Sequence, residues 1–183
     1  MILKKFVYKK IDSTNNQAIK IIKRTKNKSG IIIAHSQDKG RGRYGRKWIS
    51  YKGNLFVTIF FVLENNMVSL KKITQINCLL VKKLLSFYCK KIISIKRPND
   101  LLINKKKISG ILQEVIKKDN IKYMIVGIGI NLIKNPKIKN YPTTNLSEES
   151  VRPINKNKII MRLKELYEKS IPKINSFTEN RIL

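Results

Sequence analysis

Gly40-Arg41-Gly42-Arg43-Tyr44-Gly45-Arg46-Lys47-Trp48 is the stretch around which the rest of this sequence is arranged, and it holds three glycines, four cations and the only tryptophan. Glycines let main-chain N–H groups come close to a ligand, and arginines offer forked donors that suit carboxylate and phosphate oxygens. A tryptophan adds a flat face on which a nucleobase can stack. The stretch therefore predicts a loop that holds an anionic, nucleotide-containing small molecule, although an arginine/glycine loop touching nucleic acid or solvent has the same pattern.

Two familiar phosphate-binding loops are excluded for this stretch. Gly40 and Gly45 have the glycine spacing of a Walker A loop, but that motif continues with lysine and then serine or threonine, and here Arg46 and Lys47 follow. A dinucleotide-binding loop needs a third glycine at a fixed spacing where a strand turns into a helix, whereas a strand is expected after Trp48. The residues therefore indicate an anion-binding loop of another kind.

The composition describes a strongly basic chain of one-domain size. Its 183 residues are enough to bury one core, and its formal net charge is +29. Such a charge raises nucleic acid or an acidic partner as a candidate. The cations, however, are mostly lysines spread through every segment, which favours a solvated basic surface over a specific nucleic-acid site.

The cysteines and the single histidine exclude several classes of site. Cys78 and Cys89 are too few for a disulfide framework and lack the other ligands of a zinc site, so buried free thiols are expected. His35 alone cannot form a histidine-based metal cluster. The residues after Met1 do not form a signal peptide, and no apolar run is long enough to span a bilayer. A reducing, cytoplasmic compartment is therefore expected.

Periodicity and turn signals predict an α/β chain. Strands are expected at 6–11, 31–34, 54–63, 92–95, 101–103, 107–116 and 122–132. Helices are expected at about 12–26, 69–88 and 155–171, and the polar residues 134–153 are expected to be loop. This order predicts a mixed, largely antiparallel sheet with helices packed mainly on one face.

Two glycines interrupt the last predicted strand, Val126-Gly127-Ile128-Gly129-Ile130-Asn131. Alternating residues of a strand share a face, so Gly127 and Gly129 leave part of one face without side chains. A ligand or another part of the chain is expected to approach that face closely, and a tight packing site fits as well as a binding site. Ser13 and Thr14, before the first helix, fit plain capping better than binding when they are considered alone.

Four separated segments together resemble biotin protein ligase, the enzyme that attaches biotin to carboxylase subunits. They are Asp12-Ser13-Thr14-Asn15, the stretch from Gly40 to Trp48, Lys96 to Glu114 (Lys-Arg-Pro-Asn-Asp-Leu-Leu-Ile-Asn-Lys-Lys-Lys-Ile-Ser-Gly-Ile-Leu-Gln-Glu) and Val126 to Leu132. Their order and spacing match the catalytic domain of that family over about residues 1–135. The resemblance implies the biotin/lipoyl ligase fold, which is similar to class II aminoacyl-tRNA synthetases.

The resemblance implies a single catalytic domain over residues 1–183, with a core at about 1–135 and a helical tail at 150–183. Since residue 1 leaves no room for the DNA-binding winged helix of repressor-type members, the monofunctional type without specific DNA binding is expected. The small C-terminal SH3-like barrel of the family is not evident. That barrel assists ATP handling and acceptor docking, so its absence puts the reaction rate in doubt.

A two-step reaction is what the resemblance implies. The biotin carboxylate attacks the α-phosphorus of ATP in the presence of Mg²⁺, which gives biotinyl-5′-adenylate and pyrophosphate. A lysine amine of the biotin carboxyl carrier protein then attacks the acyl carbon and releases AMP. The enzyme is expected to act in the cytoplasm as a monomer or homodimer, without a membrane partner.

The resemblance also implies roles for individual residues. Lys107 would lie between the biotin carboxylate and the α-phosphate, and Arg41 and Arg43 would bind both groups, so these three are the expected catalytic residues. The expected biotin-binding residues are Ser13, Thr14, Asn15, Gln37, Gly40, Arg41, Gly42, Arg43, Lys107, Gly110, Gly127 and Gly129. The expected ATP-binding residues are Arg41, Arg43, Arg46, Trp48, Asn99, Asp100 and Asn131. Asp100 is also the candidate magnesium ligand, because Mg²⁺ held through substrate phosphates needs few protein ligands.

Arg97 departs from the pattern, because the family usually has tryptophan at this place, and the segment around it is expected to pack differently. The nearest alternative enzyme is a lipoate or octanoate ligase or transferase of the sister family, whose loop usually carries an Arg-x-x-Gly-Gly-Gly run. A basic nucleic-acid-binding module is an alternative of another class. A decayed, truncated ligase that binds biotin but turns over poorly is a third.

Overall fold

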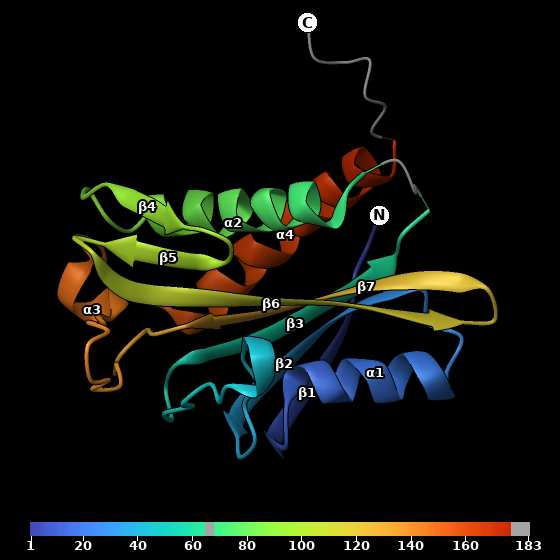
Figure 1. Ribbon diagram of the computed structural model, residues 1–183, viewed down its shortest axis with the longest axis horizontal. Helices are drawn as coiled ribbons and strands as arrows, with labels where there is room; N and C mark the ends of the chain where they lie inside the picture. Colours follow the sequence, from blue (N-terminus) through green and yellow to red (C-terminus); the bar gives the residue numbers. More distant parts are fainter. Residues whose placement is uncertain (65–67, 177–183) are drawn as a thin grey trace, which may run out of the picture.

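The computed structural model describes residues 1–64 and 68–176 (Figure 1). Its strands are β1 (Lys4–Ile11), β2 (Ser29–Gln37), β3 (Leu55–Val62), β4 (Ile93–Lys96), β5 (Asp100–Ile103), β6 (Lys106–Lys118) and β7 (Ile121–Ile130). They form one sheet in the order β1-β2-β3-β7-β6-β5-β4. β1 and β2 are parallel and the other neighbouring pairs are antiparallel, which confirms the predicted mixed, largely antiparallel sheet.

The connections between the strands explain this pattern. α1 (Thr14–Arg24) crosses from β1 to β2, and a crossover of this kind is what two parallel neighbours require. Two-residue turns, Asn104-Lys105 and Asp119-Asn120, join β5 to β6 and β6 to β7. All four turn residues have positive φ, the conformation whose twist matches that of antiparallel strands.

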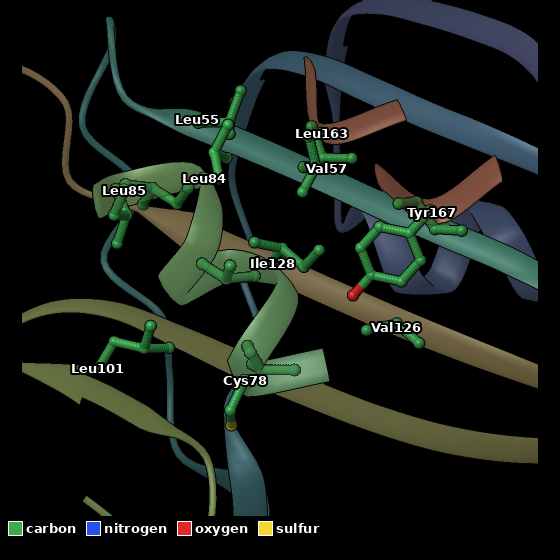
Figure 2. Close-up of a cluster of buried hydrophobic side chains, with 14 of the residues drawn as sticks. Leu55, Val57, Cys78, Leu84, Leu85, Leu101, Val126, Ile128, Leu163 and Tyr167 are labelled. Carbon is green, nitrogen blue, oxygen red and sulfur yellow. The ribbon is translucent and has the colours of Figure 1, made fainter. Parts of the chain in front are cut away.

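The long helices lie on opposite faces of the sheet. α2 (Leu70–Ser86) and α4 (Lys156–Asn175) cover one face, and α1 covers part of the other (Figure 1). On the first face, Val57 of β3 and Ile128 of β7 pack with Leu84, Leu163 and Tyr167 of the two helices (Figure 2). Alternate strand residues point the other way and pack with α1, among them Ile32, Phe60 and Ile125. The helices are thus mainly on one face, as predicted, and α1 is the exception.

The short length of α1 leaves part of its face of the sheet without a helix. The glycine/arginine loop, residues 40–48, follows β2 and contains one 3-10 turn, η1 (Arg43–Gly45). Trp48 at the end of this loop reaches Gly110 of β6 and Gly129 of β7 on the uncovered part of the sheet. The loop therefore completes the face that α1 leaves open.

Three local features differ from the sequence prediction. Residues 134–153 contain a short helix, α3 (Leu146–Glu149), and α4 continues four residues beyond its predicted end at 171. At the start of α1, Ser13 makes no side-chain capping hydrogen bond, and the Thr14 N–H donates instead to Gln37 Oε1 at 2.7 Å. Plain capping by Ser13 is therefore wrong. In the described part of the chain, no helix is both long enough and apolar enough to cross a membrane.

Candidate active site

A cavity of about 810 Å³ lies on the α1 face of the sheet, between the start of α1, the glycine/arginine loop and residues of β5, β6 and β7. Strand register assembles its floor: Gly110 of β6 is paired with Gly129 of β7, and Gly127 is paired with Thr58 of β3. Most of the predicted site residues line this cavity: Ser13, Thr14, Asn15, Gln37, Arg41, Gly42, Arg43, Arg46, Trp48, Asn99, Asp100, Lys107, Gly110, Gly127 and Gly129.

Gly40 and Asn131 were predicted to contact substrates but do not line the cavity. A side chain at Gly40 would come within 2.5 Å of the Trp48 carbonyl oxygen, and the Trp48 N–H donates to the Gly40 carbonyl at 2.9 Å, so this glycine closes the base of the loop. Asn131 is buried and its Nδ2 donates to the Thr144 carbonyl at 3.1 Å, while its Oδ1 has no hydrogen-bond partner among the described residues. Both residues therefore shape the site from outside it.

Side chains of the chain itself fill the space above the floor glycines. The indole of Trp48 lies against Gly110 and Gly129, and a methyl group at Gly110 would come within 2.8 Å of Trp48 Cζ3. The amide of Asn15 lies against Gly127 closely enough to overlap any side chain there. The glycine pattern allowed a tight packing site or a binding site, and close packing by Trp48 and Asn15 is what the structure shows. The expected role of these glycines toward biotin stays a prediction.

The reactive end of the cavity is organised around Lys107. Its Nζ lies 2.8 Å from Asp100 Oδ1, and Tyr141 Oη donates to Asp100 Oδ2 at 2.7 Å. The Lys107 ammonium also lies 5.4 Å from the Trp48 ring centroid and 5.5 Å from that of Tyr141. Burial raises the pKa of the Tyr141 hydroxyl, and the hydrogen bond to Asp100 and its charge raise it further, so this hydroxyl stays a donor at neutral pH. The carboxylate of Asp100 is thus held between the ammonium of Lys107 and the hydroxyl of Tyr141.

The main chain of Lys107 is fixed by the segment that follows β7. The Lys107 N–H donates to the Pro142 carbonyl at 2.8 Å, and the Lys107 carbonyl accepts from the Thr144 N–H at 2.9 Å. This pairing is parallel and extends the sheet locally beyond β6. Tyr141 directly precedes Pro142, and its hydroxyl binds Asp100, the partner of Lys107. The same segment therefore holds the lysine through its backbone and through this carboxylate.

The arginines of the loop have different partners. Arg41 pairs with Glu114 on β6, with 2.5 Å between Nη2 and Oε1, and also donates to Asn16 Oδ1 at 2.7 Å. Among the residues that the structure describes, Arg43 donates only to neutral partners, Asn99 Oδ1 at 3.3 Å and the Tyr44 hydroxyl at 2.8 Å. The guanidinium of Arg43 therefore retains its full positive charge toward the cavity, whereas that of Arg41 is balanced by a carboxylate of the chain.

The start of α1 is held by amide side chains. Gln37 Oε1 accepts from the N–H and from the hydroxyl of Thr14, at 2.7 and 3.0 Å. Asn15 Nδ2 donates to Glu114 Oε2 at 2.7 Å and to the Leu112 carbonyl at 3.3 Å. Both amide protons of Asn15 therefore have partners within the protein, and its contact with biotin stays a prediction.

Sequence reasoning missed three residues that define the site: Tyr141, Glu114 and Thr58. Tyr141 lies outside the segments that carried the family resemblance, in a stretch expected to be plain loop. Glu114 ended one of those segments but received no role, although a carboxylate on a strand beside an arginine-rich loop was a usable signal. Arg97 lines the cavity as a further cation next to a cis peptide bond to Pro98. Its substitution for tryptophan thus changes the charge of the wall.

The described residues contain no group of three or more histidine, cysteine, aspartate or glutamate side chains arranged to hold a metal ion. Asp100 is the carboxylate that lines the cavity beside Lys107, with Asn99 next to it. A hard cation bound mainly through phosphate oxygens takes one or two such oxygen ligands from the protein. The donor set therefore fits a substrate-carried Mg²⁺ and not a permanently bound metal.

Comparison with known proteins gives a consistent family. Residues 7–131 match the biotin/lipoate A/B protein ligase family. The bifunctional ligase/repressor BirA of Bacillus spizizenii is 29% identical over 167 residues, which are 87% of this chain and 51% of that protein. The biotin–[acetyl-CoA-carboxylase] ligase of Paracoccus denitrificans is 32% identical over 128 residues, which are 68% of this chain and 53% of that protein. The chain thus spans about half the length of these curated relatives.

Solved structures agree with the sequence matches. The biotin protein ligase of Aquifex aeolicus in complex with biotin and ATP has a TM-score of 0.77 and 28% identity, and the match covers 96% of this chain and 73% of that one. An archaeal lipoate protein ligase from Thermoplasma acidophilum has a TM-score of 0.66 at 9% identity, and that match covers 94% of this chain and 85% of that one. The second likeness is one of fold alone.

Proposed function

The chain belongs to the biotin/lipoate A/B protein ligase family, and from that membership we propose that it is a biotin protein ligase, which activates biotin with ATP and transfers it to a lysine of an acceptor protein. The observation that carries the proposal is the convergence of Lys107, Arg43 and Arg46 on one cavity. Three cations that line one cavity suit a reaction that brings a carboxylate and a triphosphate together.

In the first half-reaction a carboxylate oxygen of biotin attacks the α-phosphorus of ATP, and the bond from that phosphorus to the bridging oxygen breaks to release pyrophosphate. Lys107 lies between the two anions and neutralises the charge that develops at phosphorus. Arg43 and Arg46 hold the phosphates. Since no proton has to be moved in this step, positioning and fixed charges account for the catalysis.

Magnesium enters this step with ATP. Asp100 and Asn99 are the oxygen ligands proposed for it, and the ion supplies further neutralisation of the triphosphate. Asp100 holds Lys107 through one carboxylate oxygen and Tyr141 through the other. The same carboxylate would therefore position both the lysine and the magnesium-bound nucleotide.

In the second half-reaction the ε-amine of an acceptor lysine attacks the acyl carbon of biotinyl-5′-adenylate. The amide bond forms, the amine loses a proton, and AMP leaves. The proposed acceptor is a biotin carboxyl carrier protein, supported by the relative named biotin–[acetyl-CoA-carboxylase] ligase. A cytoplasmic reaction fits the two free, buried thiols at Cys78 and Cys89.

The choice of biotin over lipoate rests on the relatives. The Paracoccus denitrificans relative at 32% identity and the Aquifex aeolicus structure at 28% identity have biotin in their name or title, whereas the lipoate ligase is similar at 9% identity. The loop of this chain also lacks the run of three glycines expected of the lipoate enzymes. Lipoate or octanoate activation is therefore the second candidate.

The test is biotin-dependent exchange of pyrophosphate into ATP with Mg²⁺. The wild type is compared with Lys107→Ala and Arg43→Ala, and with Lys117→Ala as a control, because Lys117 is an exposed lysine of the same strand. We expect exchange with biotin and not with lipoate, a loss of at least about a hundredfold in the two site variants, and no change in the control.

Other results separate the alternatives. Exchange with lipoate or octanoate but not with biotin would mean that the chain has the activity of the sister family. Exchange that survives Lys107→Ala would remove the lysine from the mechanism. Silence with all three acids would reject the ligase proposal for this chain, and a nucleic-acid titration at several salt concentrations would then test the basic binding module.

A further inference from the structure

Glu114 is a partly buried carboxylate that the proposed reaction does not use. It lies on β6 with a side chain only 22% exposed, and it contacts two other segments of the site. Oε1 receives Arg41 of the glycine/arginine loop, and Oε2 receives the amide of Asn15 at 2.7 Å. One carboxylate therefore connects the loop above the cavity with the start of α1 below it.

The charges of the loop explain why such a connection is needed. Residues 40–48 carry four cations and no acid, so the loop repels itself and is repelled by a chain of net charge +29. Among residues 1–64 and 68–176, Arg41–Glu114 is the ion pair of 4.0 Å or less that involves this loop. The other side-chain hydrogen bonds of its arginines go to neutral groups, from Arg41 to Asn16 and from Arg43 to Asn99 and Tyr44. Within the described part of the chain, Glu114 is therefore the anion that pairs with the loop.

From these contacts we infer that Glu114 is a positioning residue, which holds the glycine/arginine loop closed through Arg41, and that Arg41 serves as the attachment point of the loop and not as a substrate ligand. The remaining cations of the loop are then the ones available to bound anions. The consequence for catalysis, retention of the adenylate under the closed loop, rests on the proposed function. That Glu114 holds the loop over the cavity does not depend on the proposed function.

The hydrogen-bond pattern makes even an isosteric change damaging. Both partners of the carboxylate are donors, so a glutamine would point its NH₂ group at either Arg41 or Asn15. Asn15 cannot accept it by turning its amide over, because its Oδ1 already accepts from Thr58 Oγ1 at 2.6 Å and its Nδ2 also donates to Leu112. Glu114→Gln therefore loses one of the two contacts, while it keeps the shape of the residue.

Limited trypsin digestion tests the inference without substrates, because the loop contains four cleavage sites at its arginines and lysine. We compare wild type, Glu114→Gln, Arg41→Ala and the double variant. The control is Glu168→Gln, which removes a carboxylate of similar exposure, 17%, from an ion pair on α4. Thermal melts identify any variant that is globally unfolded, and an Arg41→Lys variant then keeps the comparison informative.

We expect cleavage within the loop to be about tenfold faster in Glu114→Gln and in Arg41→Ala than in the wild type, and unchanged in Glu168→Gln. The effect of the double variant should be clearly smaller than the product of the two single effects, because both changes break the Arg41–Glu114 contact. Equal rates for Glu114→Gln and Glu168→Gln would overturn the inference, and so would independent, multiplicative effects in the double variant.

A second readout uses ligands. If the wild type forms biotinyl-5′-adenylate, Glu114→Gln and Arg41→Ala should each release it about tenfold faster. A biotin KM that rises in Arg41→Ala but not in Glu114→Gln would make Arg41 a substrate ligand and contradict the inference. If the wild type forms no adenylate, the proposed function fails, and the trypsin result still decides whether Glu114 holds the loop.

Discussion

Trp48 is the residue on which the shape of the cavity floor depends. Its indole occupies the space above Gly110 and Gly129, and its Nε1–H is buried without a hydrogen-bond partner in the described structure. A buried donor without an acceptor is costly, so a ligand that offers an acceptor at this place would be bound more tightly. As the only tryptophan of the chain, it also reports on its own surroundings.

The first prediction concerns Gly129→Ala. The added methyl group would overlap the indole ring, so the ring has to leave the floor and become more exposed. We expect a red shift of the intrinsic tryptophan fluorescence. Gly42→Ala is the control, because its methyl group would meet Arg46 at 3.2 Å and not the indole. An unshifted spectrum in Gly129→Ala would show that the indole does not rest on this glycine.

The second prediction concerns Tyr141→Phe, which removes the donor to Asp100 but keeps the ring over Lys96. Asp100 is then held less firmly beside Lys107, so we expect kcat of pyrophosphate exchange to fall about tenfold with little change in the biotin KM. Tyr8→Phe is the control, since Tyr8 accepts a hydrogen bond from Gln17 at 3.0 Å away from the cavity. A rise in KM with unchanged kcat would contradict a positioning role.

At the scale of elements, the helices behind the sheet support the site through polar contacts in the core. Tyr167 of α4 donates to Asn77 of α2 at 3.0 Å, and Asn77 donates to Gln113 of β6 at 2.9 Å, next to Glu114. α3 is tied to the segment between α2 and β4 by the ion pair Lys91–Glu149, 2.8 Å long. α2 and α4, on the face opposite the cavity, therefore help to hold β6, the strand that carries Lys107 and Glu114.

The third prediction concerns the pH dependence of this α3 contact. Burial would raise the pKa of the Glu149 carboxyl, but hydrogen bonds from Lys91 and Thr144 outweigh it and hold the pKa below its ordinary value. A lowered pKa in the folded state gives stability that is present above the unfolded pKa of about 4.3 and is lost as the pH falls through the folded value. Glu149→Gln should therefore be less stable than the wild type at pH 7, and the difference should shrink as the pH falls below about 4.3.

Urea unfolding at pH 7, 5 and 3 measures this difference. Glu165→Gln, at an exposed position of α4, is the matched control. A gap between wild type and Glu149→Gln that persists unchanged at pH 3 would mean that packing, and not the charge of Glu149, accounts for the loss of stability.

At the scale of the whole molecule, the net charge of +29 dominates. With 40 cationic and 11 acidic side chains, most lysines have no carboxylate to pair with, and they repel one another across the surface. Ions screen such repulsion over about 10 Å at 0.1 M salt. The folded state, in which the charges are closest together, gains more from screening than the unfolded chain does.

The fourth prediction follows from this charge. The melting temperature should rise by several degrees between 20 mM and 500 mM NaCl, since about 1 kcal/mol corresponds to a few degrees for a chain of this size. Sodium sulfate at equal ionic strength and a neutral osmolyte separate screening from preferential exclusion. A melting temperature that is independent of NaCl would mean that the lysines are far enough apart not to interact.

The sequence alone determined the long helices, the strands of the mixed, largely antiparallel sheet and the identity of most cavity residues, but not α3. Alternation in β7, the turn residues Asn104 and Asp119 and the glycine/arginine loop are local patterns, and local patterns act within a few residues. Only the tertiary structure decided what the floor glycines face and which arginine is paired with a carboxylate. Arg41 and Glu114 are 73 residues apart, and Tyr141 and Asp100 are 41 apart. Such contacts depend on how the strands and loops pack together, which no short pattern in the chain encodes.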